Sequence, residues 1–145
     1  MKIRFKYSLL VCSLLPFISL VASCQTYKCP ISQTERSKLE KKTEYTVKTQ
    51  YQVIAASTST NNDSVQVYGS IFDRISGEPL AALIQITEIK IGATADDKGQ
   101  FKLLIPKGVY KLEVINPGNF TFTTEQIKFE GDTQVNVCLG TSVIK

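Results

Sequence analysis

The sequence contains no histidine among its 145 residues. Histidine is the commonest general base, and it completes the Ser–His and Cys–His nucleophile arrangements. It is also the usual ligand of catalytic zinc. Hydrolysis based on histidine is therefore excluded, and an enzyme built on this chain would depend on carboxylates, lysine or tyrosine.

The chain also lacks the basic cluster that a nucleic-acid-binding protein needs. Its formal charge is +4, from 17 basic and 13 acidic residues. Lys2, Arg4 and Lys6 lie in a segment that we expect to be removed, which leaves 14 basic against 13 acidic residues. No stripe of Lys and Arg remains to contact a phosphate backbone, so we expect no nucleic-acid partner.

A third shortage is that of long apolar runs. Residues 8–22 (SLLVCSLLPFISLVA) form an apolar run that Pro16 interrupts. The run is too short for a comfortable membrane span and follows a basic start, as in a signal peptide. The end of the run and the two residues after it, Val21-Ala22-Ser23-Cys24, resemble the bacterial lipobox, in which the cysteine receives a diacylglycerol and cleavage occurs just before it. We therefore expect residues 1–23 to be a lipoprotein signal peptide.

Lipid on Cys24 would determine where the protein works. Two or three acyl chains hold a soluble domain on a membrane, where one chain would be marginal. We expect a lipid-anchored protein of the bacterial cell envelope, at the outer membrane, that faces the periplasm or the cell surface. An ordinary secretory signal with an incidental cysteine and an uncleaved anchor are the alternatives.

We expect residues 24–63 to form a tether, within which the sequence indicates a possible short helix and a strand. Ser32 and Glu35 fit a capping box, so a short helix can begin there, although it would have little apolar surface to bury and a solvated tether is an equal alternative. From Tyr45 on, apolar and polar residues alternate, which predicts a strand over about 44–55. This strand would be an added edge strand. A polar link follows over residues 57–64.

Short strands separated by turn residues fill the rest of the chain. Val65, Val67, Gly69 and Ile71 share one face of the first strand, and Gly69 within it indicates a bulge or a close approach by another backbone. Further strands are predicted over about 81–89, 91–95, 100–105, 110–114, 120–129 and 133–139. Strands at such spacing, without a helical period, indicate an all-β sandwich or barrel.

The turns also carry a resemblance to a known family. The motif residues run in order and end with a turn before Phe120: Gly69-x-Ile71-x-Asp73, Ser76-Gly77-Glu78-Pro79-Leu80, Ile91-Gly92, Asp96-x-x-Gly99-x-Phe101 and Pro106-x-Gly108-x-Tyr110-x-Leu112. This series resembles the carboxypeptidase regulatory-like domains of the transthyretin-like (prealbumin) superfamily, over about residues 65–139. Ala95 departs from it, because a Thr is common there, and the segment before Gly92 is about one residue short.

The resemblance implies a fold and a class of function. The fold would be a prealbumin-like antiparallel β-sandwich of about seven strands, over residues 64–140. Members of the family are mostly non-catalytic modules of peptidases, outer-membrane transporters and surface lipoproteins. The superfamily also includes a histidine-dependent hydrolase with a characteristic carboxy-terminal motif. This chain has no histidine, and its last residues, Gly140-Thr-Ser-Val-Ile-Lys145, lack that motif. We therefore expect that the protein is not an enzyme and binds no cofactor.

The motif residues themselves have structural interpretations. Asp96 and Gly99 would form a hairpin corner in which the side-chain oxygen accepts from backbone N–H groups. Tyr110 would be a buried ring with a hydrogen-bonded hydroxyl at the sheet end. A calcium site at residues 96–99 with Asn61, Asn62 and Asp63 is disfavoured, because the ligand spacing is wrong and Lys98 adds positive charge. We expect no metal.

Two cysteines remain after Cys12 is removed and Cys24 carries lipid. In an oxidising envelope compartment Cys29 and Cys138 can pair and tie the start of the tether to the last strand. Two unpaired thiols are the alternative.

The residues thus predict a non-catalytic envelope lipoprotein, an accessory or interaction module with an envelope protein as its unidentified partner. The first alternative is a surface lipoprotein that binds a glycan or a peptide, with Phe120 and Phe122 at a binding edge unless they belong to the core. A carboxylate-based hydrolase is the weakest alternative.

Overall fold

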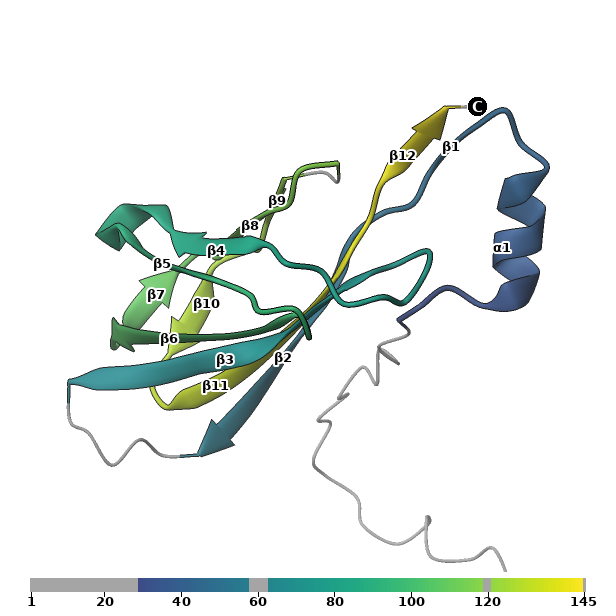
Figure 1. Ribbon diagram of the computed structural model, residues 1–145. Coiled ribbons are helices and arrows are strands. Elements are labelled where there is room, and N and C mark those ends of the chain that lie inside the picture. The colour runs from purple at the N-terminus through teal and green to yellow at the C-terminus, as the bar shows by residue number, and fades with distance from the viewer. Residues whose placement is uncertain (1–28, 58–62, 119–120, 145) are drawn as a thin grey trace, which may run out of the picture.

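The computed structural model describes residues 29–57, 63–118 and 121–144, which fold as an all-β sandwich with one short α-helix (Figure 1). This confirms the predicted fold class. The signal peptide, Cys24 and most of the polar link lie outside the described residues. No described helix is both long and apolar enough to cross a membrane.

The first layer of the sandwich is a four-stranded sheet in the order β2-β11-β3-β6. Its strands are β2 (Gln50–Ser57), β11 (Asp132–Leu139), β3 (Ser64–Asp73) and β6 (Gln100–Pro106). Most pairs are antiparallel, but β11 and β3 run parallel, which departs from the expected antiparallel arrangement. The strand expected to be an addition is β2, and it lies at the edge of this sheet.

The second layer is a sheet in the order β5-β4-β8-β9. Its strands are β5 (Ile91–Thr94), β4 (Leu83–Ile86), β8 (Glu113–Ile115) and β9 (Phe122–Thr123). Two small strand pairs complete the described part of the chain. β7 (Gly108–Tyr110) pairs with β10 (Ile127–Phe129), and β1 (Glu44–Thr46) pairs with β12 (Ser142–Ile144) in a ribbon that extends from the sandwich beside the helix (Figure 1).

Alternation of apolar and polar residues produces the core between the layers. β3 and β6 each bury every second residue, because neighbouring side chains on a strand point to opposite faces. The four residues of β3 that were predicted to share one face, Val65, Val67, Gly69 and Ile71, form its buried face. Side chains from both sheets and from β10 meet there and are fully or almost fully buried: Val65, Val67, Ile71, Ile84, Ile86, Phe101, Leu103, Ile105, Leu112, Val114, Phe129, Val135 and Val137.

Four strands that the sequence predicts as continuous are interrupted in the structure. The predicted strand over 44–55 is divided into β1 and β2, which belong to different sheets. Between them the N–H of Val47 donates to the Thr141 oxygen at 2.8 Å, and the N–H of Gly140 donates to Thr49 Oγ1 at 2.9 Å. The segments 47–49 and 140–141 therefore cross where the sheet that contains β2 and β11 ends and the β1–β12 ribbon begins.

The other interruptions also have local causes. Residues 81–89 contain β4 followed by a 3-10 helix (Thr87–Ile89), because β5 returns antiparallel beside β4 and the chain must reverse. The predicted strands 110–114 and 120–129 are also divided: the first passes from β7 to β8 and the second from β9 to β10, so that each crosses between the β7–β10 pair and the β8–β9 pair. Leu112 and Thr124 hold this crossing: the N–H of Leu112 donates to Thr124 Oγ1 at 3.0 Å, and the N–H of Thr124 donates to the Leu112 oxygen at 2.9 Å.

Helix α1 (Gln33–Glu40) begins at the predicted capping box. The N–H of Glu35 donates to Ser32 Oγ at 3.2 Å, and the N–H of Ser32 donates to Glu35 Oε2 at 3.1 Å. The helix buries none of its residues, as its low apolar content predicts. Its start is held against the sandwich, because the N–H of Ile31 donates to the Arg74 oxygen at 2.9 Å.

Candidate ligand-binding face

The outward surface of the first sheet carries mostly polar side chains, many of them amides. On β3 the outward residues are Gln66, Tyr68 and Ser70, which alternate with buried ones and are half-buried themselves. The strand register places polar residues of the neighbouring strands beside them, together with the exposed apolar side chains of Ile54 and Leu104. We call the polar residues of this surface the amide face: Gln52, Gln66, Tyr68, Ser70, Gln100, Lys102, Gln134 and Asn136.

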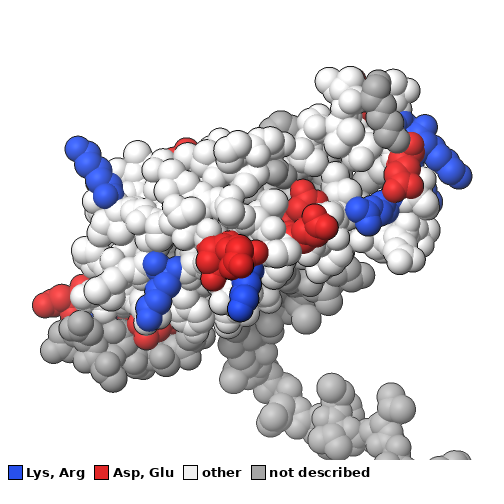
Figure 2. Space-filling view, viewed as in Figure 1, with Lys and Arg blue, Asp and Glu red and all other residues white. Residues whose placement is uncertain are grey.

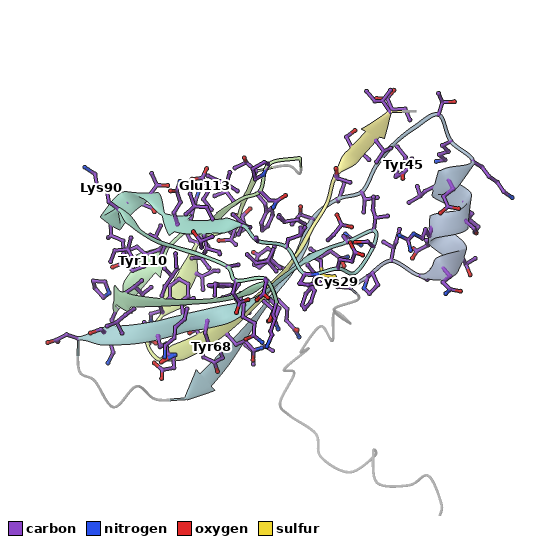
Figure 3. The ribbon with its side chains drawn as sticks, in the orientation of Figure 1. Cys29, Tyr45, Tyr68, Lys90, Tyr110 and Glu113 are labelled. Carbon is purple, nitrogen blue, oxygen red and sulfur yellow. A yellow bond between two sulfur atoms is a disulfide. The ribbon has the colours of Figure 1, made fainter. Side chains whose placement is uncertain are left out.

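Strand register brings these residues into rows across the sheet. In one row Gln134 of β11 lies beside Tyr68 of β3, and Tyr68 lies beside Lys102 of β6. In the next row Ser70 pairs with Gln100. Figure 3 shows Tyr68 on the side of β3 and β11 that faces away from β4 and β8. Residues that lie far apart in the sequence therefore share one surface.

An open groove of about 540 Å³ runs over part of the amide face. Side chains of β11, β3 and β6 line it on one side, and the end of β5 with the following turn lines it on the other. The lining residues are Gln66, Tyr68, Gly69, Ser70, Ala93, Thr94, Asp96, Gln100, Phe101, Lys102 and Gln134. A groove of this volume can hold part of a chain-like ligand while the rest stays in solvent.

The hydrogen-bonding groups of the groove are largely available. Gln134 Nε2 donates to Asn136 Oδ1 at 3.2 Å, which orients the two amides on β11. Among the described residues, the side chains of Gln66, Tyr68 and Ser70 make no hydrogen bond to the protein. The Gln66 amide offers two donors and an acceptor, and the tyrosine offers a ring with a polar hydroxyl. The surface thus suits a ligand with many hydroxyl groups.

The two charged residues of the groove differ in what they do. The Lys102 side chain is exposed. Asp96 Oδ1 accepts from the N–H groups of Lys98 at 3.0 Å and Gln100 at 2.7 Å, so this carboxylate holds the turn before β6, as the sequence analysis expected. Within the described ranges no three acidic or cysteine residues are grouped as metal ligands.

The remaining motif residues form turns and packing contacts outside the groove. Asp73 Oδ1 accepts from the N–H groups of Ile75 at 2.8 Å and Ser76 at 2.7 Å, which closes the turn that Pro79 ends. Gly77 and Gly99 have positive φ angles of 78° and 72°, a backbone conformation that favours glycine. These residues shape the end of the sandwich and are not among the residues that line the groove.

Tyr110 and Gly108 also have a packing role. The Tyr110 ring stacks on Phe129 with centroids 6.4 Å apart, and its hydroxyl donates to the Lys107 oxygen at 3.5 Å. The ring is half-buried rather than buried as expected. A Cβ on Gly108 would lie 2.6 Å from the end of the Tyr110 side chain, so any larger residue there would displace the ring. The alternative of a binding edge at Phe122 finds no support, because its ring packs against Tyr51 and the core. Phe120 lies outside the described residues.

Cys29 and Cys138 are joined by a disulfide in the structure, with Cα atoms 6.0 Å apart. The bond fixes the chain at residue 29 to the end of β11 (Figure 3).

Sequence reasoning did not identify the amide face as a site. The alternation in β3 places Gln66, Tyr68 and Ser70 together, but Gln134 joins them only through the parallel pairing of β3 and β11. The signal that could have found it is the repeated occurrence of amides at the outward positions of four separate strands.

Comparison with protein-family models finds no match, and comparison with curated proteins finds none either. Among solved structures, one that matches is a "putative carbohydrate binding protein" from Bacteroides uniformis, with 15% identity and a TM-score of 0.42. The alignment covers 52% of this chain and 40% of the other, so the chain spans less than half of that protein. At these values the similarity carries no argument about ligand or activity.

Proposed function

We propose that the protein is a non-catalytic lipoprotein of the bacterial cell envelope whose β-sandwich binds a neutral glycan in the groove of the amide face. The observation that carries the proposal is the groove itself, in which Gln66, Tyr68, Ser70 and Gln134 converge from two strands with their hydrogen-bonding groups directed outward.

The chemistry of the groove favours a glycan over a charged ligand. Sugar hydroxyls donate and accept hydrogen bonds, as amide side chains do, so the two are complementary. The Tyr68 ring supplies an apolar surface against which the face of a sugar ring can pack. Lys102 and Asp96 have opposite charges, so the groove carries no net charge for an anionic or cationic ligand.

The groove also favours binding over catalysis. The titratable side chains that line it are Tyr68, Asp96 and Lys102. Asp96 already accepts two backbone hydrogen bonds, and no second carboxylate lines the groove to act with it in glycoside hydrolysis. A binding module is the role that fits this set.

The test is a binding screen of the mature chain against neutral oligosaccharides based on glucose, mannose, galactose and N-acetylglucosamine. We expect at least one to bind, and Tyr68→Ala or Gln134→Ala to weaken it about tenfold or more, through lost stacking or a lost hydrogen bond. Gln85→Ala is the matched control, because it shortens an amide on the other sheet. Binding of peptides but no sugar, or equal binding by all variants, would overturn the proposal.

The lipid anchor and the family form the second part of the proposal. We propose that Cys24 carries the lipid and that the sandwich is a carboxypeptidase regulatory-like domain, on the resemblance of its turn motifs. Cys24→Ala should abolish labelling by a fatty-acid analogue and leave the precursor unprocessed. Normal maturation of this variant would refute the anchor. Cross-linking on intact cells would test for an envelope protein partner, the accessory role.

A further inference from the structure

The described N-terminal residues are attached to one end of the sandwich by three contacts. The disulfide joins Cys29 to Cys138. The N–H of Ile31 donates to the Arg74 oxygen at 2.9 Å. Pro30 packs so closely on the turn after β3 that a Cβ on Gly77 would lie 2.9 Å from its Cγ. The chain therefore leaves the sandwich at this end.

Cys24 lies five residues before Cys29. An extended chain advances at most about 3.6 Å per residue, so the two residues are no more than about 18 Å apart. Since the proposed function places a lipid on Cys24, it also brings this end of the sandwich to the membrane surface. A tether that ran free as far as residue 63 would impose no such orientation.

This end carries a hollow of about 560 Å³ between α1, the segment after β1 and the turn after β3. Ile31, Leu39 and Val47 are among its apolar lining residues. Four cationic side chains line it, Lys38, Lys42, Lys48 and Arg74, together with one carboxylate, Glu35. Figure 2 shows Lys and Arg side chains at the α1 end of the molecule, with acidic side chains beside them.

The charge of the hollow exceeds that of the whole mature chain. Four cations and one carboxylate give +3, whereas 14 basic and 13 acidic residues give +1 for the chain from residue 24 on. Glu35 already accepts from the N–H and the hydroxyl of Ser32. The Arg74 guanidinium donates to the Lys48 backbone oxygen, which holds it at the hollow. The rest of the mature chain is therefore slightly acidic.

We propose that this hollow, which we call the basic hollow, rests on the membrane that holds the lipid anchor and binds the phosphate headgroups of anionic phospholipids. The inference rests on the proposed lipid at Cys24 for its orientation. Clustered Lys and Arg beside an anchor are attracted to anionic lipid, and their attraction adds to that of the acyl chains. The amide face is then carried at a defined height and direction above the membrane.

The test uses the mature chain from residue 24 with Cys24→Ser, so that no acyl chain contributes. Co-sedimentation is measured with vesicles of phosphatidylethanolamine and phosphatidylglycerol in a 3:1 ratio, and with neutral phosphatidylcholine vesicles. We expect binding to the first kind only. Replacing Lys38, Lys42 and Lys48 together by Gln should weaken it at least about tenfold, because each cation near an anionic surface contributes to the attraction.

Two matched variants separate charge at this place from charge in general. Replacing Lys107, Lys111 and Lys128 by Gln removes the same charge from exposed positions outside the hollow and should leave binding close to that of the parent. Replacing Lys38, Lys42 and Lys48 by Arg keeps the charge and should retain binding. Thermal unfolding of each variant checks that it folds.

Three results would overturn the inference. The first is equal binding by the two Gln variants. The second is binding to neutral vesicles as strong as to anionic ones. The third is loss of binding on addition of inorganic phosphate at constant ionic strength, which would make the hollow a site for small anions. Because the assay contains no lipid anchor, its failure is distinct from a failure of Cys24 labelling or of glycan binding.

Discussion

Gly69 lies where β3 passes close to the backbone of β11 at Val135. A Cβ at this position would be 1.8 Å from the Val135 oxygen and 2.6 Å from its carbonyl carbon, and both are backbone atoms that cannot rotate away. Of the two readings that the sequence allowed, a bulge or a close approach, the structure shows the close approach. The glycine is therefore required by the parallel pairing of the two central strands.

Gly69→Ala should lower the free energy of unfolding by about 3 kcal/mol, because the strands must separate to admit the methyl group. Gly118→Ala is the control. Gly118 has no atom within 4 Å of its added Cβ but has a φ of 94°, so strain alone should cost about 1 kcal/mol. Urea unfolding measures both variants. A smaller effect at Gly69 than at Gly118 would contradict this account of the sheet.

At the scale of elements, the sequence predicts the strands of the main sheet well and the connections poorly. β3 and β6 alternate regularly because one face meets the core and the other meets solvent. Alternation reports which face is buried, however, and not which sheet a strand joins. The change of sheet at Val47 therefore left no signal in the pattern, and β12 was not predicted at all.

The buried Thr124 gives a second reason why the sequence predicts the connections between strands poorly. Its hydroxyl and its backbone N–H both form hydrogen bonds with the backbone of Leu112, which is twelve residues earlier in the chain. These bonds hold the chain where it crosses between the β7–β10 and β8–β9 pairs. Only the folded arrangement gives the threonine this partner. A single sequence offers no reason to separate it from other polar residues between strands.

Helix α1 depends on its cap more than on packing. Ser32→Ala removes the hydroxyl that accepts from the N–H of Glu35 and should destabilise the helix by about 1 kcal/mol. Because α1 buries no residue, the global free energy of unfolding should change by less than about 0.5 kcal/mol. Hydrogen exchange should show about fivefold faster exchange in α1 alone. A global loss as large as the local one would show that α1 is part of the core.

At the scale of the whole molecule, the disulfide closes almost the entire described chain, since Cys29 and Cys138 are 109 residues apart. Replacing both by Ala should lower the free energy of unfolding by about 2–4 kcal/mol, chiefly because the unfolded chain regains freedom. Reductant should lower the unfolding midpoint of the parent and leave that of the double variant unchanged. Two free thiols in the unfolded parent, without reductant, would contradict the bond.

The proposed function depends on an arrangement that only the whole molecule contains. The sequence could suggest export, a lipid anchor and a sandwich, because each has a local pattern. Amides at outward strand positions were visible in it, but it could not place them on one surface, because Gln134 and Tyr68 are 66 residues apart and meet only through strand order. The surface is therefore a property of the fold, and so is the orientation to the membrane that we propose for it.

The most direct test of the central claim is to map where a sugar binds. Backbone amide chemical shifts of the mature chain would be followed by nuclear magnetic resonance as the strongest-binding oligosaccharide of the screen is added. The account predicts that the largest changes lie at Gln66, Tyr68, Ser70 and Gln134 and at the adjoining part of β6. Changes centred on the opposite sheet, around Gln85 and Glu113, or no changes at all, would contradict it.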